Sequence, residues 1–371
     1  MSDADSPAPS TVASETDEEP VLAVENLRTT FYTDKETIRA VDGISFDIGP
    51  GETVGIVGES GSGKSVTARS IMGLVDAPGR VEDGSSIRFK GEELVGKSPE
   101  QWREIRGNGI AMVFQDPLSS LNPVYTVGNQ IKEAVRLHRD KRGQEATDVA
   151  IELLEAVGIP DAARRLKEYP HQFSGGMRQR AMIAMALACD PELLICDEPT
   201  TALDVTIQAQ ILQLLKDLQE ERDLSIMFIT HDMGVIAQVA DRVNVMYAGE
   251  IVESAPVVEL FEDPRHPYTR GLLRSIPGRQ QGERLETIEG DVPTPTEEPT
   301  YCRFAPRCPK AFEDCEAVHP VSVPVESGAT DHTAACLLYP EDRSREEAVE
   351  LHRSRGTDAD ADTTADAEDD Q

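Results

Sequence analysis

The 371-residue sequence predicts an α/β fold, in which a parallel sheet is joined by an antiparallel β region and a helical insertion. A short apolar run at 53–57 ends in a glycine-rich turn, and a helical pattern follows it. This order is typical of a strand, a phosphate-binding loop and a helix. Two further buried-strand patterns, at 193–196 and 225–230, enclose the amphipathic helical pattern 207–221, which indicates a parallel crossover.

The rest of the α/β unit is predicted from shorter patterns. Residues 21–32 and 38–48 alternate apolar and polar side chains and predict two paired antiparallel strands. Three helical patterns follow in the middle of the chain, at 127–138, 144–157 and 176–189. We therefore expect a helical subdomain at about 116–190, inserted into the α/β unit.

Composition divides the chain into four parts. The first twenty residues hold six acids and no base, and residues 341–371 hold twelve acids and four bases. Both segments are poor in apolar residues, so 1–20 and 341–371 are expected to be disordered tails. Between them we expect the α/β unit over 21–262 and a proline-containing, loop-rich segment over 263–340, with one short helical pattern at 268–275.

The chain is strongly acidic, with 36 Lys and Arg against 68 Asp and Glu and a formal net charge of −32. This balance disfavours a nucleic-acid binder of the usual basic kind. The acidic excess extends beyond the tails and favours adaptation to high salt, and an acidic patch for a basic partner is the alternative. No run of about eighteen apolar residues and no secretory signal occur, so a cytoplasmic chain that does not span the bilayer is expected.

A phosphate-binding loop is predicted by the pattern G-x-x-x-x-G-K-[ST]. It is formed by Gly58, Glu59, Ser60, Gly61, Ser62, Gly63, Lys64 and Ser65. Glycines let backbone N–H groups turn toward phosphate oxygens, and the following helix adds the positive end of its dipole. We expect Lys64 to bridge the β- and γ-phosphates and Ser65 to ligate Mg²⁺, with Val66 completing the ATP-binding set. A glycine-rich surface loop is the alternative, and the strand before and helix after argue against it.

Two adjacent acids, Asp197 and Glu198, follow the apolar pattern 193–196. Acids at the carboxyl end of a buried strand usually serve a ligand. We expect Asp197 to hold Mg²⁺ and Glu198 to polarise the water that attacks the γ-phosphorus. Taken alone, the pair of acids is as typical of a solvated strand end as of a ligand site. Its occurrence in the same chain as the phosphate-binding loop favours a nucleotide site.

The segment 173–179 (FSGGMRQ) is similar to the signature segment of the ATP-binding subunits of ABC transporters. Further motifs stand in the order of that family: Gln115 after the strand-like pattern 110–114, the signature, Asp197 with Glu198, Ala202-Leu203-Asp204, and His231. The chain therefore resembles an ABC ATPase over about 21–260. It departs from the family pattern at Phe173 and Met177, where Leu and Gln are more common.

The resemblance implies a head-to-tail pair of ATPase domains, in which the signature of one chain closes over the γ-phosphate bound by Lys64 of the other. The signature residues that would act on the partner's ATP are Ser174, Gly175, Gly176 and Met177. Asp204 would contact the partner. Taken alone, Asp204 is also typical of a helix N-cap.

The resemblance also assigns roles around the γ-phosphate. Gln115 would sense Mg²⁺ and the attacking water, and His231 would hold the γ-phosphate and orient Glu198. Taken singly, His231 is more typical of a capping or core histidine, and Gln115 is more typical of a polar residue at the end of a strand. Their positions after strand patterns, in the order of the family's motifs, favour the family roles. Phe31 would stack on adenine, with Tyr32 as the alternative. An aromatic residue at either position is equally typical of packing within a strand.

Residues 115–123 (QDPLSSLNP), 178–180 (RQR) and 266–269 (HPYT) resemble the oligopeptide/dipeptide importer branch, which also takes nickel and other small solutes. A cysteine-rich extension in one of its two ATPase types is similar to the C-terminal cysteines here, Cys302, Cys308, Cys315 and Cys336.

Four thiolates on loops of a cytosolic chain favour metal ligation over disulfides. They suit Zn²⁺ or a [4Fe–4S] cluster. The missing C-x₂-C knuckle and the resemblance favour the cluster over zinc, and free thiols are the third alternative. Cys189 and Cys196 are expected to be small core residues.

The function implied is a peripheral ATPase subunit at the cytoplasmic face of the cell membrane. It would pair with a second, different ATPase subunit, press the helical insertion near 116–128 against two permease subunits, and power uptake of peptides or similar solutes delivered by an external binding protein. No nucleic-acid partner is expected. The alternatives are a soluble ABC ATPase of DNA repair or ribosome handling, and a nucleotide sensor without turnover.

Overall fold

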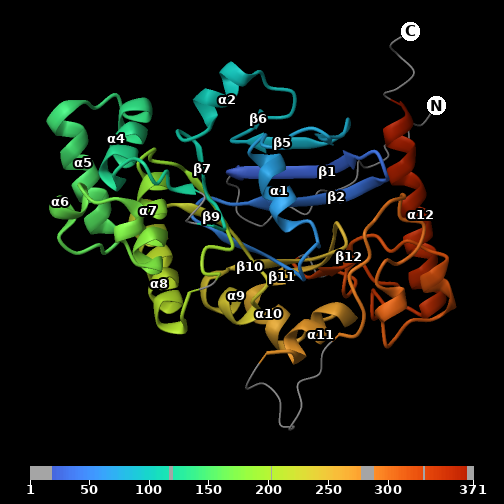
Figure 1. Cartoon of the computed structure of the whole chain (residues 1–371). Coiled ribbons are helices and arrows are strands. Elements are labelled where there is room, and N and C mark those ends of the chain that lie inside the picture. Colours follow the sequence, from blue (N-terminus) through green and yellow to red (C-terminus); the bar gives the residue numbers. More distant parts are fainter. Residues whose placement is uncertain (1–18, 117–119, 202, 277–287, 329–330, 366–371) are drawn as a thin grey trace.

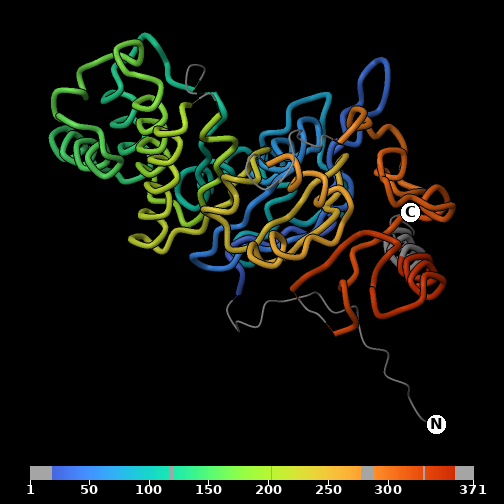
Figure 2. Tube along the Cα trace, turned by 90° about the horizontal axis from the view of Figure 1, so that it is seen from below, coloured from blue at the N-terminus to red at the C-terminus, as the bar shows by residue number. Residues whose placement is uncertain are grey.

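The computed structural model describes residues 19–116, 120–201, 203–276, 288–328 and 331–365, and side chains up to residue 355. Two sheets form the middle of the molecule, with a helical subdomain at one end and the C-terminal segment at the other (Figures 1 and 2). The tail expected at 1–20 lies outside the described residues except for its last two positions.

The N-terminal sheet is antiparallel and has five strands. Its order is β2-β1-β5-β6, with β4 paired to β1. The strand bounds are β1 Leu22–Tyr32, β2 Thr37–Ile48, β4 Gly79–Val81, β5 Ser86–Phe89 and β6 Glu92–Glu93. Helix α2 (Pro99–Ile105) follows this sheet. The predicted pairing of the first two strands is confirmed, because Leu22 pairs with Ile48 and Tyr32 with Thr37.

The second sheet has eight strands in the order β12-β13-β11-β10-β3-β9-β8-β7. The bounds are β3 Thr53–Val57, β7 Ile110–Val113, β8 Leu193–Asp197, β9 Ser225–Thr230, β10 Arg242–Tyr247, β11 Glu250–Pro256, β12 Val323–Pro324 and β13 Thr333–Ala334. Strands β7, β8, β9, β3 and β10 are parallel. Helix α8 (Val205–Arg222) connects β8 to β9, so the predicted parallel crossover is confirmed. Because the strands are parallel, their carboxyl ends meet at one edge.

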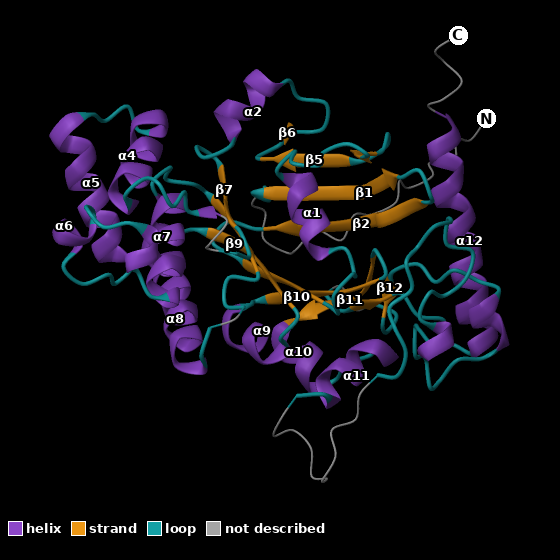
Figure 3. Ribbon diagram, viewed as in Figure 1, coloured by secondary structure: helices purple, strands orange, loops and turns teal. Residues whose placement is uncertain are grey.

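Helix α1 (Lys64–Ile71) lies between the two sheets (Figure 3). It begins directly after the phosphate loop that follows β3. Its buried side chains share one apolar core with Leu22, Ile44 and Ile56 from both sheets. Packing on both sides fixes the position of the helix relative to the loop.

The helical subdomain is a bundle between β7 and β8. Its elements are α4 Val127–His138, α5 Gly143–Ala156, α6 Ala162–Arg165, the 3₁₀ turn η1 Pro170–Gln172, and α7 Gly175–Leu187. Thr126 caps α4 by accepting a hydrogen bond from the Asn129 amide at 3.3 Å. The helices bury Ile131, Val135 and Leu153 against one another. The three helices predicted from their apolar periodicity are confirmed within two residues.

The C-terminal segment packs against the second sheet. Three helices precede or open it: α9 Met233–Val239, α10 Val257–Glu262 and α11 Pro267–Arg274. Two 3₁₀ turns follow, η2 Ala305–Arg307 and η3 Glu313–Glu316. The segment also adds β12 and β13 to the sheet, which the sequence patterns did not predict, because each strand is two residues long.

The expectation of a wholly disordered tail at 341–371 is wrong, because helix α12 spans Arg345–Ala365. The helix is held by a few buried side chains in an acidic stretch. Ala348, Val349 and His352 are buried, and His352 accepts a hydrogen bond from the Val321 amide at 3.1 Å.

None of the described helices has the length and apolar composition needed to cross a membrane.

Candidate active site

The phosphate loop depends on two glycines at its ends. A Cβ on Gly58 would lie 2.1 Å from the Met246 carbonyl oxygen, and a Cβ on Gly63 would lie 2.3 Å from the Ala40 carbonyl oxygen. Gly63 also has a φ of +105°, which favours glycine. Larger residues would push the loop away from β10 and β2, so the close backbone approach explains why glycine is present.

Lys64 folds back into this loop. Its Nζ donates to the carbonyl oxygens of Gly58 at 2.8 Å and Glu59 at 2.9 Å, and to Ser62 Oγ at 3.3 Å. Burial lowers the pKa of Lys64, while the carboxylates of Glu198 and Asp197 oppose this shift. The ammonium group thus lies inside the loop, next to helix α1, whose N-cap Gly63 supplies no side-chain cap. Phosphate oxygens are stronger acceptors than the carbonyls that hold the ammonium here.

Ser65 and Asp197 form the second part of the site. Ser65 Oγ donates to Asp197 Oδ1 at 2.9 Å, which joins the start of α1 to the end of β8. Burial raises the pKa of Asp197, and the hydrogen bond from Ser65 opposes this. Hydroxyl and carboxylate oxygens are ligands of the kind that Mg²⁺ binds, so this pair fits the expected ion.

Three side chains converge on Glu198. Gln115 Nε2 donates to Glu198 Oε2 at 3.1 Å, Thr201 Oγ1 donates to the same oxygen at 2.8 Å, and His231 Nδ1 lies 3.1 Å from Oε1. Gln115 follows β7 and His231 follows β9, so the shared edge of the parallel strands brings them together. Glu198 itself has a φ of +48°, a left-handed conformation that is uncommon for a residue with a side chain.

These contacts set the charge of Glu198. Burial raises its pKa, but the hydrogen bonds from Thr201 and His231 outweigh burial, and the pKa lies below its ordinary value. Glu198 is therefore ionised at neutral pH. Gln115, which the sequence interpretation placed next to Mg²⁺, contacts Glu198 here rather than the Ser65–Asp197 pair.

Thr201 was missed by the sequence interpretation. It lies three residues after Glu198, and its amide donates to the Glu198 carbonyl oxygen at 3.2 Å. A threonine three residues after an acid in a tight turn is a pattern from which this hydrogen bond could have been predicted.

The signature residues lie at the start of α7. Ser174 caps this helix, with its Oγ accepting from the Met177 amide at 3.4 Å. Gly176 is buried, and a Cβ there would lie 2.6 Å from Ile207 of α8. Phe173 is also buried, whereas Ser174 and Gly175 are exposed. In the part of the chain that the structure describes, none of these residues forms a hydrogen bond with the phosphate loop.

Asp204 caps α8 and accepts from the Ile207 amide at 2.9 Å. Of the two aromatic residues considered for adenine, Phe31 is partly buried beside Gly79. Tyr32 is 45% exposed, donates to Glu82 at 2.8 Å, and has the Arg80 guanidinium 4.5 Å from its ring centre. Stacking on adenine stays a prediction for Phe31.

The four C-terminal cysteines form no disulfide bonds, and the thiols influence one another's pKa. Burial raises the pKa of each, and the neighbouring cysteines raise the pKa of Cys336 further. The Lys310 amide donates to Cys308 Sγ at 3.4 Å. Across the described residues, no group of three or more His, Cys, Asp or Glu side chains is arranged to hold a metal ion. Cys196 is fully buried, as expected for a core residue, and Cys189 is half-buried.

Comparison with known proteins shows the family to which the chain belongs. The family model described as ABC transporter matches residues 41–201, and the model described as oligopeptide/dipeptide transporter, C-terminal region, matches residues 252–315. The oligopeptide transport ATP-binding protein AppD of Bacillus subtilis is 52% identical over 324 residues, which are 87% of this chain and 98% of that protein. The chain belongs to the ABC transporter family. It is an ATP-binding subunit of that family, and its reaction is the hydrolysis of ATP.

Other relatives agree with this ABC assignment. A putative peptide import ATP-binding protein of Brucella abortus is 52% identical over 335 residues, or 87% of this chain and 98% of that protein. The dimeric ATP-binding cassette MJ0796 bound to ADP and Pi has a TM-score of 0.57 and 29% identity, over 64% of this chain and 98% of that chain. The structure of cbiO1 from Clostridium perfringens has a TM-score of 0.57 and 27% identity, over 66% of this chain and 92% of that chain. These comparisons give no support to the DNA-repair alternative.

Proposed function

We propose that this ABC ATPase powers an importer of dipeptides, oligopeptides or related small solutes. The observation that carries the proposal is the convergence of Gln115, Thr201 and His231 on an ionised Glu198 beside the phosphate loop. Peptide import is supported by the names of the relatives and by the C-terminal region shared with oligopeptide/dipeptide transporters. The domain bounds 21–262 and 263–340 are part of this proposal.

Uptake of labelled di- and oligopeptides in cells that lack the chain tests this function. Wild-type protein should restore uptake, and Glu198→Gln should not, although it should still bind ATP. A chain that restores no solute uptake but hydrolyses ATP faster with nucleic acid would favour the soluble class. A chain that binds ATP without any turnover would be a sensor.

The proposed catalytic roles follow from the positions of the side chains around the phosphate loop and Glu198. Ser65 and Asp197 hold Mg²⁺, and Lys64 binds the β- and γ-phosphates. Glu198 polarises the attacking water, and His231 orients Glu198 through its Nδ1 contact and holds the γ-phosphate. Catalysis comes from preorganised charge, without a covalent intermediate.

The signature is proposed to act on the ATP of a second subunit. Ser174 and Gly175 are exposed at the start of the thirteen-residue helix α7, whose amide dipoles favour an anion. The dimeric state of MJ0796 supports a paired arrangement. In that arrangement Asp204 contacts the partner, and the partner is a different ATPase subunit.

Docking on two permease subunits is proposed for the region after Gln115. Val124 is 71% exposed and Tyr125 is 54% exposed, so apolar side chains are available there. This places the subunit peripherally at the cytoplasmic face of the membrane, with an external binding protein delivering the solute. Residues 117–119 of this predicted contact lie outside the described residues.

The four C-terminal thiols are proposed to bind a [4Fe–4S] cluster, with Zn²⁺ as the alternative. The amides of Phe304, Lys310 and Leu338 donate to the sulfurs of Cys302, Cys308 and Cys336, which lowers the pKa of each thiol, although burial outweighs these hydrogen bonds. Either group requires the thiolate form, so its binding would have to displace the thiol protons. A [4Fe–4S] cluster would supply a redox-active centre when bound. Iron and acid-labile sulfide on anaerobically purified protein, against zinc, distinguish the two, and the absence of all three would leave free thiols.

Adaptation to high salt is proposed from the net charge of −32. Screening of like charges should raise the melting temperature between about 0.1 and 1 M KCl, where the Debye length falls from about 10 to about 3 Å. A melting temperature that does not rise over this range would contradict the proposal.

A further inference from the structure

Glu59, the second residue of the phosphate loop, is paired with an arginine from the C-terminal segment. Arg307 Nη1 donates to Glu59 Oε2 at 2.8 Å, and Arg307 Nη2 donates to Glu59 Oε1 at 3.1 Å. The two residues are 248 positions apart. The Arg307 side chain is only 6% exposed and the Glu59 side chain is 31% exposed, so the arginine end of this two-pronged ion pair is shielded while the carboxylate is partly open to water.

A second contact holds the main chain of the same residue. The Glu59 amide donates to the hydroxyl of Tyr268 at 2.9 Å, and Tyr268 is fully buried in α11. The Tyr268 ring packs against Tyr247 and Phe304, with ring centres 4.7 and 5.4 Å away. The rigid aromatic cluster therefore fixes the position of the hydroxyl that receives the loop amide.

Arg307 is itself held in place. Its Nε donates to the Glu289 carbonyl oxygen at 2.9 Å, and its guanidinium lies 5.7 Å from the centre of the Tyr247 ring. The hydrogen bonds from Arg307 to Glu59 raise the pKa of the guanidinium above its ordinary value. Arg307 therefore remains charged at any pH at which the protein is folded.

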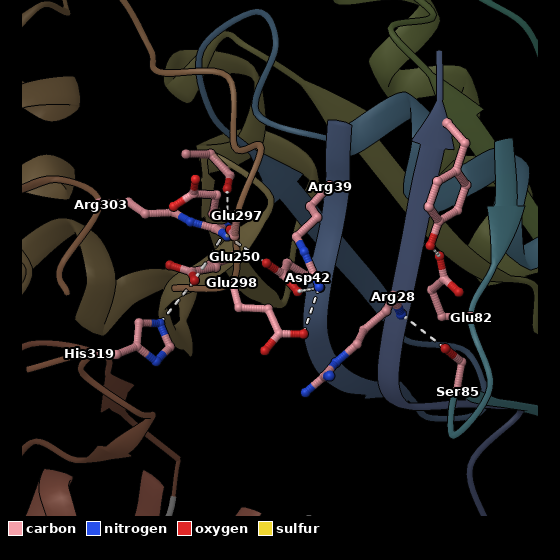
Figure 4. A network of polar contacts seen from close by, with 12 residues as sticks. Arg28, Arg39, Asp42, Glu82, Ser85, Glu250, Glu297, Glu298, Arg303 and His319 are labelled. Carbon is pink, nitrogen blue, oxygen red and sulfur yellow. Dashed lines mark hydrogen bonds and ion pairs between the residues drawn. The ribbon is translucent and has the colours of Figure 1, made fainter. Parts of the chain in front are cut away.

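The segment that carries Arg307 is attached to the body by a second arginine. Arg303 donates to the Ala248 carbonyl oxygen at 2.7 Å and pairs with Asp42 and Glu250 (Figure 4). Arg39 of β2 in turn pairs with Glu298 of the same segment. The network explains why a loop-rich segment keeps one position beside the phosphate loop.

The pairing matters because of where Glu59 lies. Its carbonyl oxygen accepts from Lys64 Nζ at 2.9 Å, so the same residue that carries a negative charge also helps to place the phosphate-binding ammonium. An unpaired carboxylate in this loop would repel the phosphates of the nucleotide. Arg307 removes this repulsion and fixes the loop conformation at the same time.

We propose that Arg307 is a positioning residue for nucleotide binding, which acts by pairing with Glu59 while Tyr268 holds the loop amide. The proposal rests on the nucleotide site described above and extends it to the C-terminal segment. It assigns to that segment a direct part in setting the affinity for MgATP and MgADP.

The test uses the purified full-length chain and the variants Arg307→Gln, Arg307→Lys, Glu59→Gln and the double variant Glu59→Gln/Arg307→Gln. The dissociation constant for MgADP should rise about five- to thirty-fold in Arg307→Gln, because the unpaired Glu59 carboxylate then repels the phosphates. The double variant should recover most of the affinity, because no unpaired carboxylate remains. Arg307→Lys should lie between Arg307→Gln and wild type. ATP turnover should show a raised KM with kcat within about twofold.

Control variants separate the role of Arg307 from a general effect of lost charge and from failure of the nucleotide site itself. Arg136→Gln removes the same charge from an exposed position in α4 and should bind like wild type. An Arg307→Gln affinity within about twofold of wild type, or a double variant no better than Arg307→Gln, would overturn the proposal. If Arg307→Gln does not fold, wild-type affinity in Arg307→Lys would overturn it and weakened affinity would support it. Unchanged affinity in Lys64→Ala would instead reject the nucleotide site itself.

Discussion

Gln115 donates a hydrogen bond from Nε2 to Oε2 of Glu198 across 3.1 Å, which joins residues 83 positions apart. Gln115 follows β7 and Glu198 follows β8, and these strands are parallel neighbours. The contact therefore results from the sheet topology, which places both side chains at the carboxyl edge. His231 reaches the other oxygen of Glu198 from the end of β9. A single carboxylate thus joins the ends of three strands.

Removing the hydroxyl of Thr201 should change the pH dependence of turnover. The hydrogen bond from Thr201 lowers the pKa of Glu198, so Thr201→Val should raise that pKa. Glu198 would then be protonated at a higher pH, and the acid limb of the kcat profile should move toward neutral pH. The measurement is ATP turnover between about pH 5 and 8. An acid limb at the wild-type position would show that another group controls it.

Ser65→Ala should weaken the response to Mg²⁺ more than the binding of nucleotide. The variant loses the hydroxyl that faces Asp197 but keeps the Lys64 ammonium and the loop amides. The Mg²⁺ concentration for half-maximal ATP turnover should rise about tenfold, corresponding to the loss of one oxygen ligand. Ser60→Ala, in the same loop, is the matched control. Equal Mg²⁺ responses in the two variants would contradict the assigned ligand.

His266 should make the protein less stable below neutral pH. Its side chain is buried, and burial lowers its pKa from 6.5 to about 4. Because the folded pKa lies below the unfolded value, the neutral ring stabilises the fold above about pH 6.5, and this contribution is lost as the pH falls toward 4. Between pH 7 and pH 5 the loss amounts to about 2 kcal/mol.

His266→Asn separates this titration from the structural role of the residue. His266 Nδ1 accepts from the Tyr268 amide at 3.1 Å, and asparagine retains an N-cap acceptor but does not titrate. Denaturant unfolding of wild type and variant at pH 7 and pH 5 measures the difference. A variant that loses as much stability as wild type over this range would contradict the assignment to His266.

Much of the nucleotide site was predictable because its elements have local patterns. Strand β3, helix α1 and strand β8 each follow from an apolar run or helical spacing next to glycine or paired acids. The family resemblance implied that His231 contacts Glu198, and it implied a place next to Mg²⁺ for Gln115, which instead contacts Glu198. The helices α4, α5 and α7 were also found, since each has a clear apolar face.

The C-terminal segment was less predictable, because its order depends on contacts between distant residues. Strands β12 and β13 are too short to leave a periodic pattern. Helix α12 lies in an acidic stretch whose composition suggests disorder, and it is held by a few buried side chains such as Val349 together with the ion pair between Arg353 and Asp314. Nothing local to Glu59 or Arg307 indicates that the two residues form an ion pair.

The central claim, that Glu198 drives ATP hydrolysis in this ABC subunit, is tested most directly by turnover of the assembled ATPase carrying Glu198→Gln. We predict a fall in kcat of about 10²-fold or more with MgATP still bound at wild-type affinity. Glu192→Gln, an exposed acid just before β8, should turn over ATP like wild type. Turnover by Glu198→Gln within about threefold of wild type would contradict the claim, because removal of a catalytic base costs far more than this.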